Sequence, residues 1–296
     1  MIELRRAESD TEFERWRSVR LAVEPNERTF EVSEIRERIA REPERLYLLA
    51  ELDGELAGSG FMGRSDLGYG AVRPLVLPAV RRRGVGTAVL EALLDHARAI
   101  GSTVASSSVD GADERSLSFA RRHGFEEYDR QVEMVRLLDG PVPEPPFDGV
   151  EFVTIAERPE LLEAAYPLAC EGYADLKLAV GSVSVTREEW LRDEATLPAG
   201  SFVALADGDV VGYAGLTAWP NDPTRAEHGL TVVRRDWRRR GLATALKTRE
   251  LAWAAVNGIA ELVTWTQRGN DALQGVNERL GYAVRSISVS VAKDIR

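Results

Sequence analysis

The chain has 296 residues, of which 44% are hydrophobic and 29% are charged, and it carries a net charge of −10. The length predicts two domains, and the composition is typical of a folded protein rather than a disordered one. The negative charge argues against a protein whose main ligand is nucleic acid or an acidic membrane. The only cysteine, Cys170, excludes an internal disulfide and a multi-cysteine metal site, and we expect its side chain to pack in the core.

No segment reaches the roughly 18 apolar residues of a membrane span, and the first residues lack the apolar stretch of a signal peptide. The three histidines are not spaced as metal ligands. We therefore expect a cytoplasmic protein with no metal, no nucleic-acid partner and no membrane partner.

The predicted elements occur in one order that is repeated. In the first half, alternation and helical periodicity indicate a strand, two helices, two hairpin strands, a strand, a helix and a strand, at residues 2–5, 9–23, 33–41, 47–51, 56–63, 75–77, 85–100 and 103–109. The second half gives the same series at residues 151–154, 160–176, 186–194, 201–206, 210–219, 230–233, 242–256 and 262–266. Each hairpin tip is Asp-Gly, which tight turns favour.

The two series are separated by a proline-rich segment, residues 138–149, whose four prolines are incompatible with a helix or a central strand. The motif Arg81–Ala88 returns as Arg238–Ala245, an offset of 157 residues that holds as far as Gly124 and Gly281. We therefore predict a duplicated mixed α/β domain. The predicted copies span residues 1–140 and 150–296, joined by a linker over residues 141–149.

Each copy carries the pattern Arg-x-x-Gly-x-Gly or Arg-x-x-Gly-x-Ala between a strand and a long helix. Glycine lets backbone amides approach a phosphate, the helix N-terminus adds donors and a positive dipole, and arginine adds charge. Thr87 and Thr244 can each add a hydroxyl. The pattern predicts a pyrophosphate site in each copy. It is neither a nucleotide P-loop, which needs a lysine, nor a three-glycine Rossmann fingerprint.

Val76–Gly86 resembles motif A of the GCN5-related N-acetyltransferases, the GNAT family, and Val232–Ala243 resembles it again. Ser118–Phe125 and Asn270–Tyr282 resemble the helix and strand that close the family's domain. The resemblance covers nearly the whole chain, and the layout is similar to that of tandem, mycothiol synthase-type acetyltransferases. It implies two tandem GNAT domains, each a mixed, mostly antiparallel sheet flanked by helices, with acetyl-CoA as cofactor.

By this resemblance, the pyrophosphate of coenzyme A lies on the loop amides. The pantetheine arm pairs with the strand before the loop, where neighbouring strands must splay. The residues implied in the first copy are Leu75, Val76, Leu77, Arg82, Arg83, Gly84, Val85, Gly86 and Thr87. Those implied in the second copy are Val232, Val233, Arg234, Arg239, Arg240, Gly241, Leu242, Ala243, Thr244, Asn270 and Asn277.

The family's usual base is a glutamate on the strand before the loop, eleven positions before the first arginine of motif A. That position is Glu227 in the second copy and Gly70 in the first. Strand alternation places Glu227 on the same face as Val233, and the alternative base, His228, on the opposite face. The resemblance therefore implies that the second copy is catalytic, with Glu227 or His228 as the base, and that the first copy is catalytically degenerate.

The family's usual acid is a tyrosine four residues before the motif B glycine. Ala120 and Asn277 occupy that position in the two copies, so neither copy has the tyrosine. A thiol has a pKa of only about 8.5, which makes this acid the most dispensable group in the expected reaction.

We expect an N-acetyltransferase that moves the acetyl group of acetyl-CoA to a primary amine of a small molecule by direct attack, with Glu227 as base or through a water relay. The chain is expected to be a monomer with an internal pseudo-dimer, or a homodimer. Two alternatives stay open. One is a non-catalytic acyl-CoA-binding sensor or interaction protein, which the missing tyrosine favours. The other is an aminoacyl transferase that uses charged tRNA, which the negative charge disfavours. The acceptor pocket is expected near loops 24–30, 177–185 and 219–225.

Overall fold

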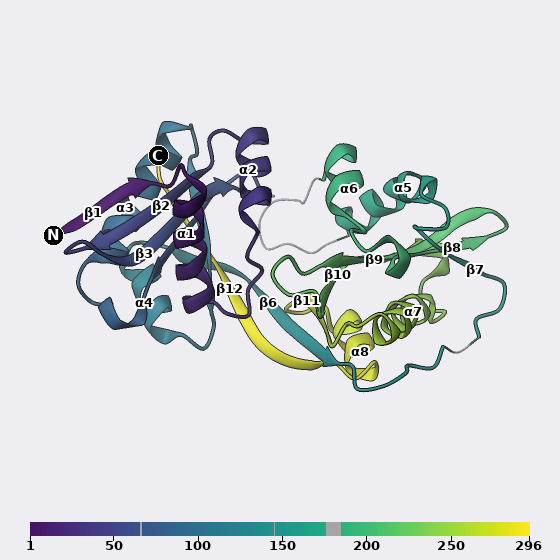
Figure 1. Cartoon of the computed structure of the whole chain (residues 1–296). Coiled ribbons are helices and arrows are strands. Elements are labelled where there is room, and N and C mark those ends of the chain that lie inside the picture. Colours follow the sequence, from purple (N-terminus) through teal and green to yellow (C-terminus); the bar gives the residue numbers. More distant parts are fainter. Residues whose placement is uncertain (66, 145, 176–184) are drawn as a thin grey trace. The chain divides into compact units, whose positions relative to one another are not determined.

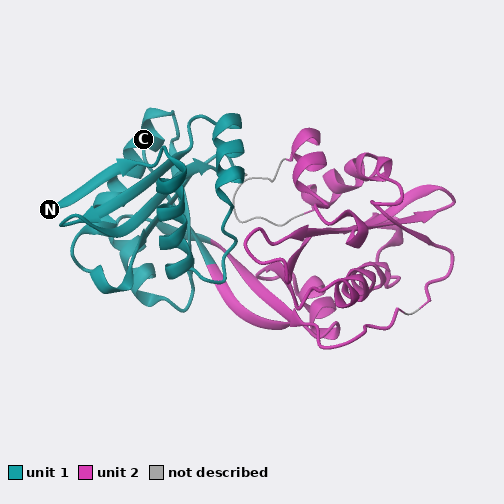
Figure 2. Cartoon of the chain, in the orientation of Figure 1, with its two compact units in different colours: residues 1–128, 289–296 teal, residues 129–288 magenta. Residues whose placement is uncertain are grey.

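The computed structural model describes residues 1–65, 67–144, 146–175 and 185–296. Contacts between residues divide the chain into two compact units (Figure 2). Unit 1 comprises residues 1–128 and 289–296, and unit 2 comprises residues 129–288. No helix of the described residues is both long enough and apolar enough to cross a membrane.

Unit 1 follows the predicted order of elements (Figure 1). It contains β1 (Ile2–Arg6), α1 (Asp10–Val23), α2 (Val32–Arg41), β2 (Leu46–Leu52), β3 (Glu55–Arg64), β4 (Gly70–Val76), the 3-10 turn η1 (Pro78–Val80), α3 (Val85–Ala99), β5 (Val104–Asp110) and α4 (Glu114–Arg122). Each strand from β1 to β4 pairs antiparallel with the next one along the chain, and β4 pairs parallel with β5. The strand before the loop is longer than the predicted segment 75–77, because it begins at Gly70.

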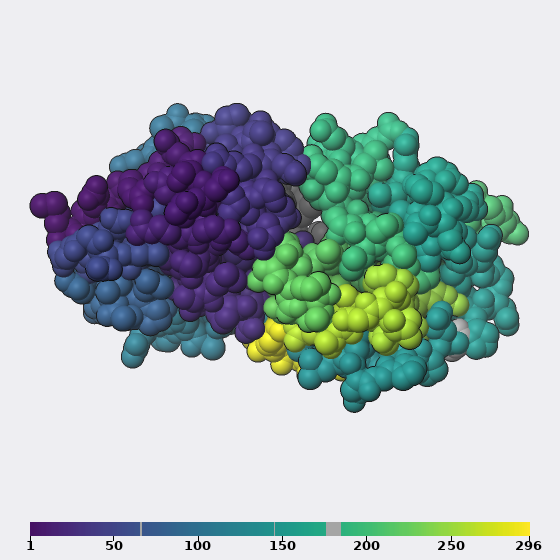
Figure 3. Space-filling view, in the orientation of Figure 1, coloured from purple at the N-terminus to yellow at the C-terminus, as the bar shows by residue number. Residues whose placement is uncertain are grey.

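The sheet of unit 1 is covered on both faces. Helix α3 packs on one face through apolar residues such as Val89 and Leu93, which are fully buried with the strands. Helices α1 and α2 cover the other face, where Phe13 and Ile35 pack against β2. In the space-filling view these two helices, in purple, form much of the visible face of unit 1 (Figure 3). Helix α1 begins at Ser9, whose side chain accepts from the backbone of Glu12 in a capping box.

Unit 2 repeats this plan. It contains β7 (Glu151–Thr154), α5 (Glu160–Ala174), α6 (Arg187–Asp193), η2 (Pro198–Gly200), β8 (Phe202–Ala206), β9 (Asp209–Ala218), β10 (Arg225–Val233), η3 (Arg235–Trp237), α7 (Leu242–Val256), β11 (Glu261–Gln267) and α8 (Asp271–Arg279). Helix α7 packs on one face of its sheet, and α5 and α6 cover the other face (Figure 1). Cys170, expected in the core, is exposed on α5 instead.

The last strand of each sequence copy completes the sheet of the other unit. Most of β6 (Glu126–Leu137) belongs to unit 2, where it pairs antiparallel with all seven residues of β11. The end of β12 (Ala283–Asp294) belongs to unit 1, where Val289 and Val291 are buried in the core beside α3. The chain therefore passes from unit 1 to unit 2 within β6 and returns within β12.

Candidate active site

The two arginine-glycine loops share one backbone conformation. Arg82 and Gly84 have φ angles of 68° and 88°, and the residues 157 positions later, Arg239 and Gly241, have 63° and 86°. Such left-handed residues turn successive amides toward one side, which makes a concavity suited to an anion. Gly84 and Gly241 are also the N-caps of α3 and α7, and neither helix start has a side-chain cap. The first-turn amides of both helices are therefore left without a side-chain acceptor.

The three arginines of each loop differ in their contacts. The first folds back onto the strand end, since Arg81 Nε donates to Val76 O at 3.2 Å and Arg238 Nε donates to Val233 O at 2.8 Å. The middle arginine, Arg82 or Arg239, is exposed and, within the described residues, has no hydrogen bond or ion pair to the protein. The middle arginine of each loop is therefore the cation best placed to meet a bound phosphate.

The strands on either side of each loop helix separate toward the loop. In unit 1, β4 and β5 pair only at Gly70 and Ala71, although β4 continues to Val76. In unit 2, β10 and β11 pair only up to Glu227, although β10 continues to Val233. Beyond these points, within the described residues, the two strands of each pair form no further backbone ladder with each other. Both units thus have the splay that an extended ligand needs in order to pair with a strand.

A β-bulge in β10 distinguishes unit 2 from unit 1. His228 pairs with Leu216 and Thr231 with Ala214, so β10 has one more residue than β9 between these two pairs. The matching strand of unit 1, β4, pairs with β3 over seven consecutive residues without interruption. The extra residue lies within Gly229-Leu230 and belongs to unit 2 alone.

Because of the bulge, two predictions about Glu227 are wrong: its counterpart in unit 1 and the face of the sheet on which it lies. Ala71 and Glu227 both occupy the last paired position before the splay, so the counterpart of Glu227 is Ala71 and not Gly70. The bulge also reverses the alternation of side chains along β10. Val232 packs against α5 and Val233 packs against α7, which places Glu227 on the face of Val232 rather than that of Val233.

Glu227 shares its face of the sheet with a second carboxylate, Glu194, which follows α6. Glu194 Oε1 accepts hydrogen bonds from the Tyr213 hydroxyl at 3.1 Å and from the bulge amide of Leu230 at 3.2 Å. Burial, with a smaller contribution from the charge of Glu227, raises the pKa of Glu194 to about 7, against the effect of those two donors. Glu194 was not among the residues predicted from the sequence.

His228 points to the opposite face and lies within a buried polar network under α7. It is 5% exposed, its Nδ1 lies 2.8 Å from Glu250 Oε2, and its Nε2 is hydrogen-bonded to the Tyr282 hydroxyl. Burial, together with the nearby charge of Lys247, holds the pKa of His228 well below its usual range, so the ring is neutral at pH 7. Lys247 is itself buried and donates to Thr264 Oγ1 at 3.4 Å.

Unit 1 has apolar residues where unit 2 has this network. The counterparts of His228, Lys247, Glu250 and Tyr282 are Val72, Leu90, Leu93 and Phe125. All four of those unit 1 residues belong to one buried apolar cluster. The buried polar groups are therefore not required by the fold, because unit 1 forms the same layers without them.

A half-buried guanidinium bridges the splayed strands of unit 1. Arg73 of β4 donates to the backbone oxygen of Ser108 on β5 at 3.1 Å and pairs with Glu24 at 2.7 Å. Arg73 takes the place that Gly229 and Leu230 share in unit 2, and the next residue, Pro74, has no amide hydrogen to offer. The gap that an extended ligand would enter is thus crossed by a side chain in unit 1.

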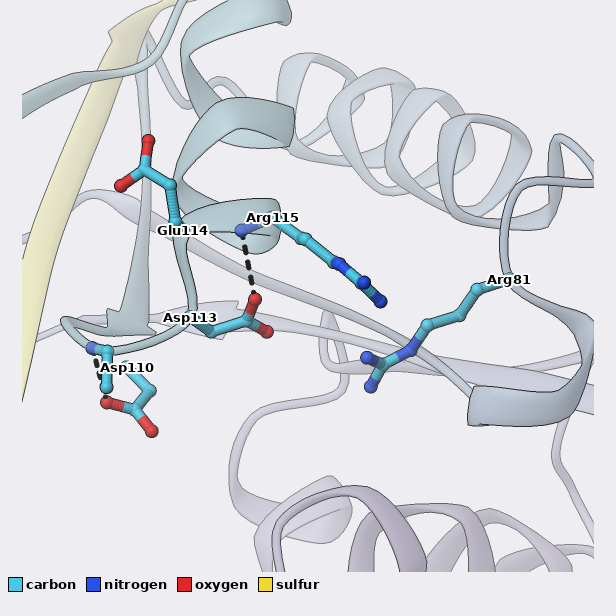
Figure 4. A pocket seen from close by; sticks show the side chains of 6 residues that line it. Arg81, Asp110, Asp113, Glu114 and Arg115 are labelled. Atoms are coloured by element: carbon cyan, nitrogen blue, oxygen red, sulfur yellow. Dashed lines mark hydrogen bonds between the residues drawn. The ribbon is translucent and has the colours of Figure 1, made fainter.

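A pocket of about 450 Å³ opens beside the loop of unit 1 (Figure 4). Arg81 and Arg115 extend toward each other across it, and Asp113 points between them. Asp113 also caps α4 by accepting from the backbone of Arg115 at 3.1 Å. With Asp110 and Glu114 on its rim, the pocket mixes both signs of charge and is a poor match for a pyrophosphate.

The other predicted cofactor residues have structural contacts. Asn270 caps α8, its side chain accepting from Leu273 N at 3.3 Å. Asn277, expected to contact the cofactor, is fully buried, with its amide nitrogen 3.9 Å from Met134 Sδ and its Oδ1 without a partner among the described residues. Thr87 lies 3.3 Å from His123 Nε2. Of the predicted acceptor loops, residues 177–184 lie outside the described part of the chain.

Glycines inside two strands were the signal that could have revealed Glu194. A Cβ atom on either Gly215 of β9 or Gly229 of β10 would overlap Glu194 Oε1. Glycine within a strand often marks the close approach of another group. No local pattern, however, tells which side chain approaches.

Each of the two α/β units has splayed central strands and a helix that starts at a left-handed glycine without a side-chain cap, and this arrangement is that of an acyltransferase fold. Residues 7–125 and residues 162–282 each match the model of the acetyltransferase (GNAT) family. The chain belongs to this family and contains two GNAT domains in tandem.

Solved structures show the same tandem fold. A GCN5-related N-acetyltransferase from Sphaerobacter thermophilus is 20% identical, with a TM-score of 0.79 over 100% of this chain and 96% of that one. A tandem GNAT protein from the clavulanic acid biosynthesis pathway is also 20% identical, with a TM-score of 0.76 over 100% of this chain and 99% of that one. Among curated proteins, none matches the chain significantly in sequence.

Proposed function

We propose that unit 2 transfers the acetyl group of acetyl-CoA to a primary amine of a small molecule. The observation that carries this proposal is the position of Glu227. It is the last residue of β10 that pairs with β11 before the two strands separate, and the bulge begins two residues later. A base, a free strand edge and an anion-binding loop thus follow one another along one strand and the helix after it. Family membership supplies the reaction class.

The residues of unit 2 fit coenzyme A. The uncapped amides at the start of α7 and the exposed Arg239 suit the pyrophosphate, and the splayed edge of β10 suits the pantetheine arm. Acetyl-CoA, when bound, supplies a thioester carbonyl and a thiolate leaving group. Glu227 would take the proton that the acceptor's ammonium group must lose before its nitrogen can attack. A backbone amide at the bulge would face the negative charge that develops on the thioester oxygen.

Burial favours Glu227 over His228 as the base. The ring of His228 has both nitrogens engaged and lies on the α7 face, whereas Glu227 is partly exposed on the other face. A general base must come within hydrogen-bond reach of the proton that it removes. His228 would need the buried network to open before it could do so.

The test uses release of free thiol from acetyl-CoA with a panel of small amines. We expect wild-type turnover on at least one amine, and a fall in kcat of about 10²-fold or more in Glu227→Gln, with the Kd for acetyl-CoA unchanged. Glu151→Gln, an exposed glutamate of β7, is the matched control and should retain full activity. Full kcat in Glu227→Gln at every pH would contradict the assignment. Binding of acetyl-CoA without turnover on any amine would favour an acyl-CoA sensor.

We further propose that unit 1 does not catalyse acetyl transfer. Its counterpart of Glu227 is Ala71, and Arg73 occupies the splay that would admit the pantetheine arm. Calorimetry with acetyl-CoA should therefore give one strong site per chain. Valine at a left-handed position costs about 1–2 kcal/mol and adds bulk, so Gly241→Val should abolish that site, while Gly84→Val should leave it. Two sites of equal affinity in the wild type would contradict this proposal.

A further inference from the structure

Glu194 is a carboxylate for which the described structure offers no cation. No arginine, lysine or histidine forms an ion pair with it among the described residues, and its donors are one hydroxyl and backbone amides. A carboxylate taken out of water without a cation gains by holding a proton. Burial raises its pKa to about 7, so its proton is exchangeable at neutral pH.

The place of Glu194 is built only in unit 2. Its Oε1 occupies a cradle formed by Gly215 and Gly229, because a Cβ atom at either position would overlap it. In unit 1 the matching positions hold Phe61 and Arg73, two large side chains that pair across β3 and β4. The residue after Glu194, Ala195, has a φ of 51°, a conformation that costs a residue with a Cβ roughly 1 kcal/mol. The chain thus accepts strain beside a carboxylate whose cradle is absent from unit 1, where the residue after the matching helix α2, Glu42, pairs with Arg45 instead.

The cradle lies next to the proposed base. Gly229 is two residues after Glu227 on β10, and the Leu230 amide that Glu194 holds belongs to the same bulge. The charge on Glu227 contributes to the raised pKa of Glu194. Two carboxylates that repel each other take up one proton together more readily than either does alone.

We propose that Glu194 is a positioning residue that acts through Glu227, the two carboxylates sharing the proton that the acceptor ammonium loses before attack. This inference rests on the proposed acetyl transfer. The ammonium gives its first proton to the pair, and the neutral nitrogen forms the new C–N bond. The nitrogen loses a second proton as the C–S bond breaks. The departing thiolate takes one proton back, so that one proton in all leaves for solvent.

Proton sharing predicts opposite effects of two substitutions on the acid limb of the pH profile of kcat/KM. Glu194→Gln keeps an acceptor for Tyr213 and Leu230 but removes the charge beside Glu227, so the limb should move to lower pH, by about one unit. Tyr213→Phe removes a hydrogen bond that lowers the pKa of Glu194, so the limb should move to higher pH. Glu188→Gln is the matched control, because this α6 side chain is 90% exposed. A purely structural role would lower kcat without moving the limb.

A second measurement needs no acceptor. In the free protein labelled with 13C at glutamate carboxyls, NMR should show a carboxyl that titrates near pH 7 and is distinct from that of Glu250, whose pKa burial also raises. That titration should disappear in Glu194→Gln and move to lower pH in Glu227→Gln. Absence of any glutamate titration between about pH 6 and 8, or a Glu227→Gln spectrum identical to wild type, would overturn the carboxylate pair. Failure of the wild type to acetylate any amine would overturn the proposed function, while the NMR titration would still decide whether the pair exists.

Discussion

Glu194 is mostly withdrawn from water without gaining a cation among the described residues, and its ionisation therefore opposes folding. The carboxyl ionises near 4.5 in the unfolded chain and near 7 in the folded chain. Between pH 4.5 and about pH 7, the carboxyl of Glu194 keeps its proton in the folded protein but has lost it in the unfolded chain. The stability that this proton contributes is fully present below pH 4.5 and is lost as the pH rises through 7.

The free energy of unfolding should therefore respond to Glu194→Gln in a pH-dependent way. Because glutamine does not ionise, the variant should gain stability relative to wild type as the pH rises from below 4.5 to 8. Each pKa unit is worth about 1.4 kcal/mol, so the relative gain should approach about 3 kcal/mol. Urea unfolding at a series of pH values measures it. The control Glu188→Gln should differ from wild type by a constant amount, and a constant difference for Glu194→Gln as well would contradict the raised pKa.

At the scale of the element, one inserted residue gives β10 its properties. The bulge shifts the alternation between His228 and Thr231, so that Glu227 and Val233 lie on opposite faces, and it frees the amide of Leu230 from the ladder with β9. His228 lies under α7, where unit 1 has the apolar Val72. The two copies thus share layers and loop geometry but differ in the strand that precedes the loop.

Gly229→Ala tests the cradle that this bulge forms. The added methyl would overlap Glu194 Oε1, and overpacking of this kind costs about 1–3 kcal/mol. We expect lower stability together with the shift of the acid limb described for Glu194→Gln. Gly275→Ala on α8 is the control, because its Cβ would meet nothing closer than Arg279 Nη1 at 3.4 Å, and alanine favours a helix by about 1 kcal/mol. Equal effects of the two substitutions would contradict a specific role for the cradle.

At the scale of the whole molecule, neither unit consists of one sequence copy alone, and unit 1 is made of two separate stretches of chain. Unit 1 needs residues 289–296 from the far end of the sequence, and unit 2 needs residues 129–137 from the first copy. Val289, Val291 and Ile295 are all buried in the core of unit 1. Ile295 also donates its amide to Thr103 O at 2.9 Å.

Truncation after Ser288 should therefore destabilise unit 1, although most of that unit, residues 1–128, lies at the other end of the sequence. Loss of three buried apolar side chains should cost unit 1 about 5 kcal/mol, with little direct effect on the core of unit 2. Hydrogen exchange should show β5 losing protection while β8 keeps it. Deletion of Arg296 alone, an exposed residue, is the control. Loss of protection in β8 rather than β5 would contradict the strand exchange.

The sequence by itself determined the duplication, the order of the elements and the two arginine-glycine loops. These features are local: periodicity, Asp-Gly turns and the arginine-glycine pattern are read within one element or at one fixed offset. Only the tertiary structure decided the register of β10, the face of Glu227, the approach of Glu194 and the exchange of β6 and β12. A bulge depends on hydrogen bonds to a neighbouring strand and is not visible in the sequence. A constant offset therefore aligned Glu227 with Gly70, whereas the structure aligns it with Ala71. The last strand of each copy carries no local signal that distinguishes the sheet of its own copy from that of the other, and only packing of the whole chain selects between them.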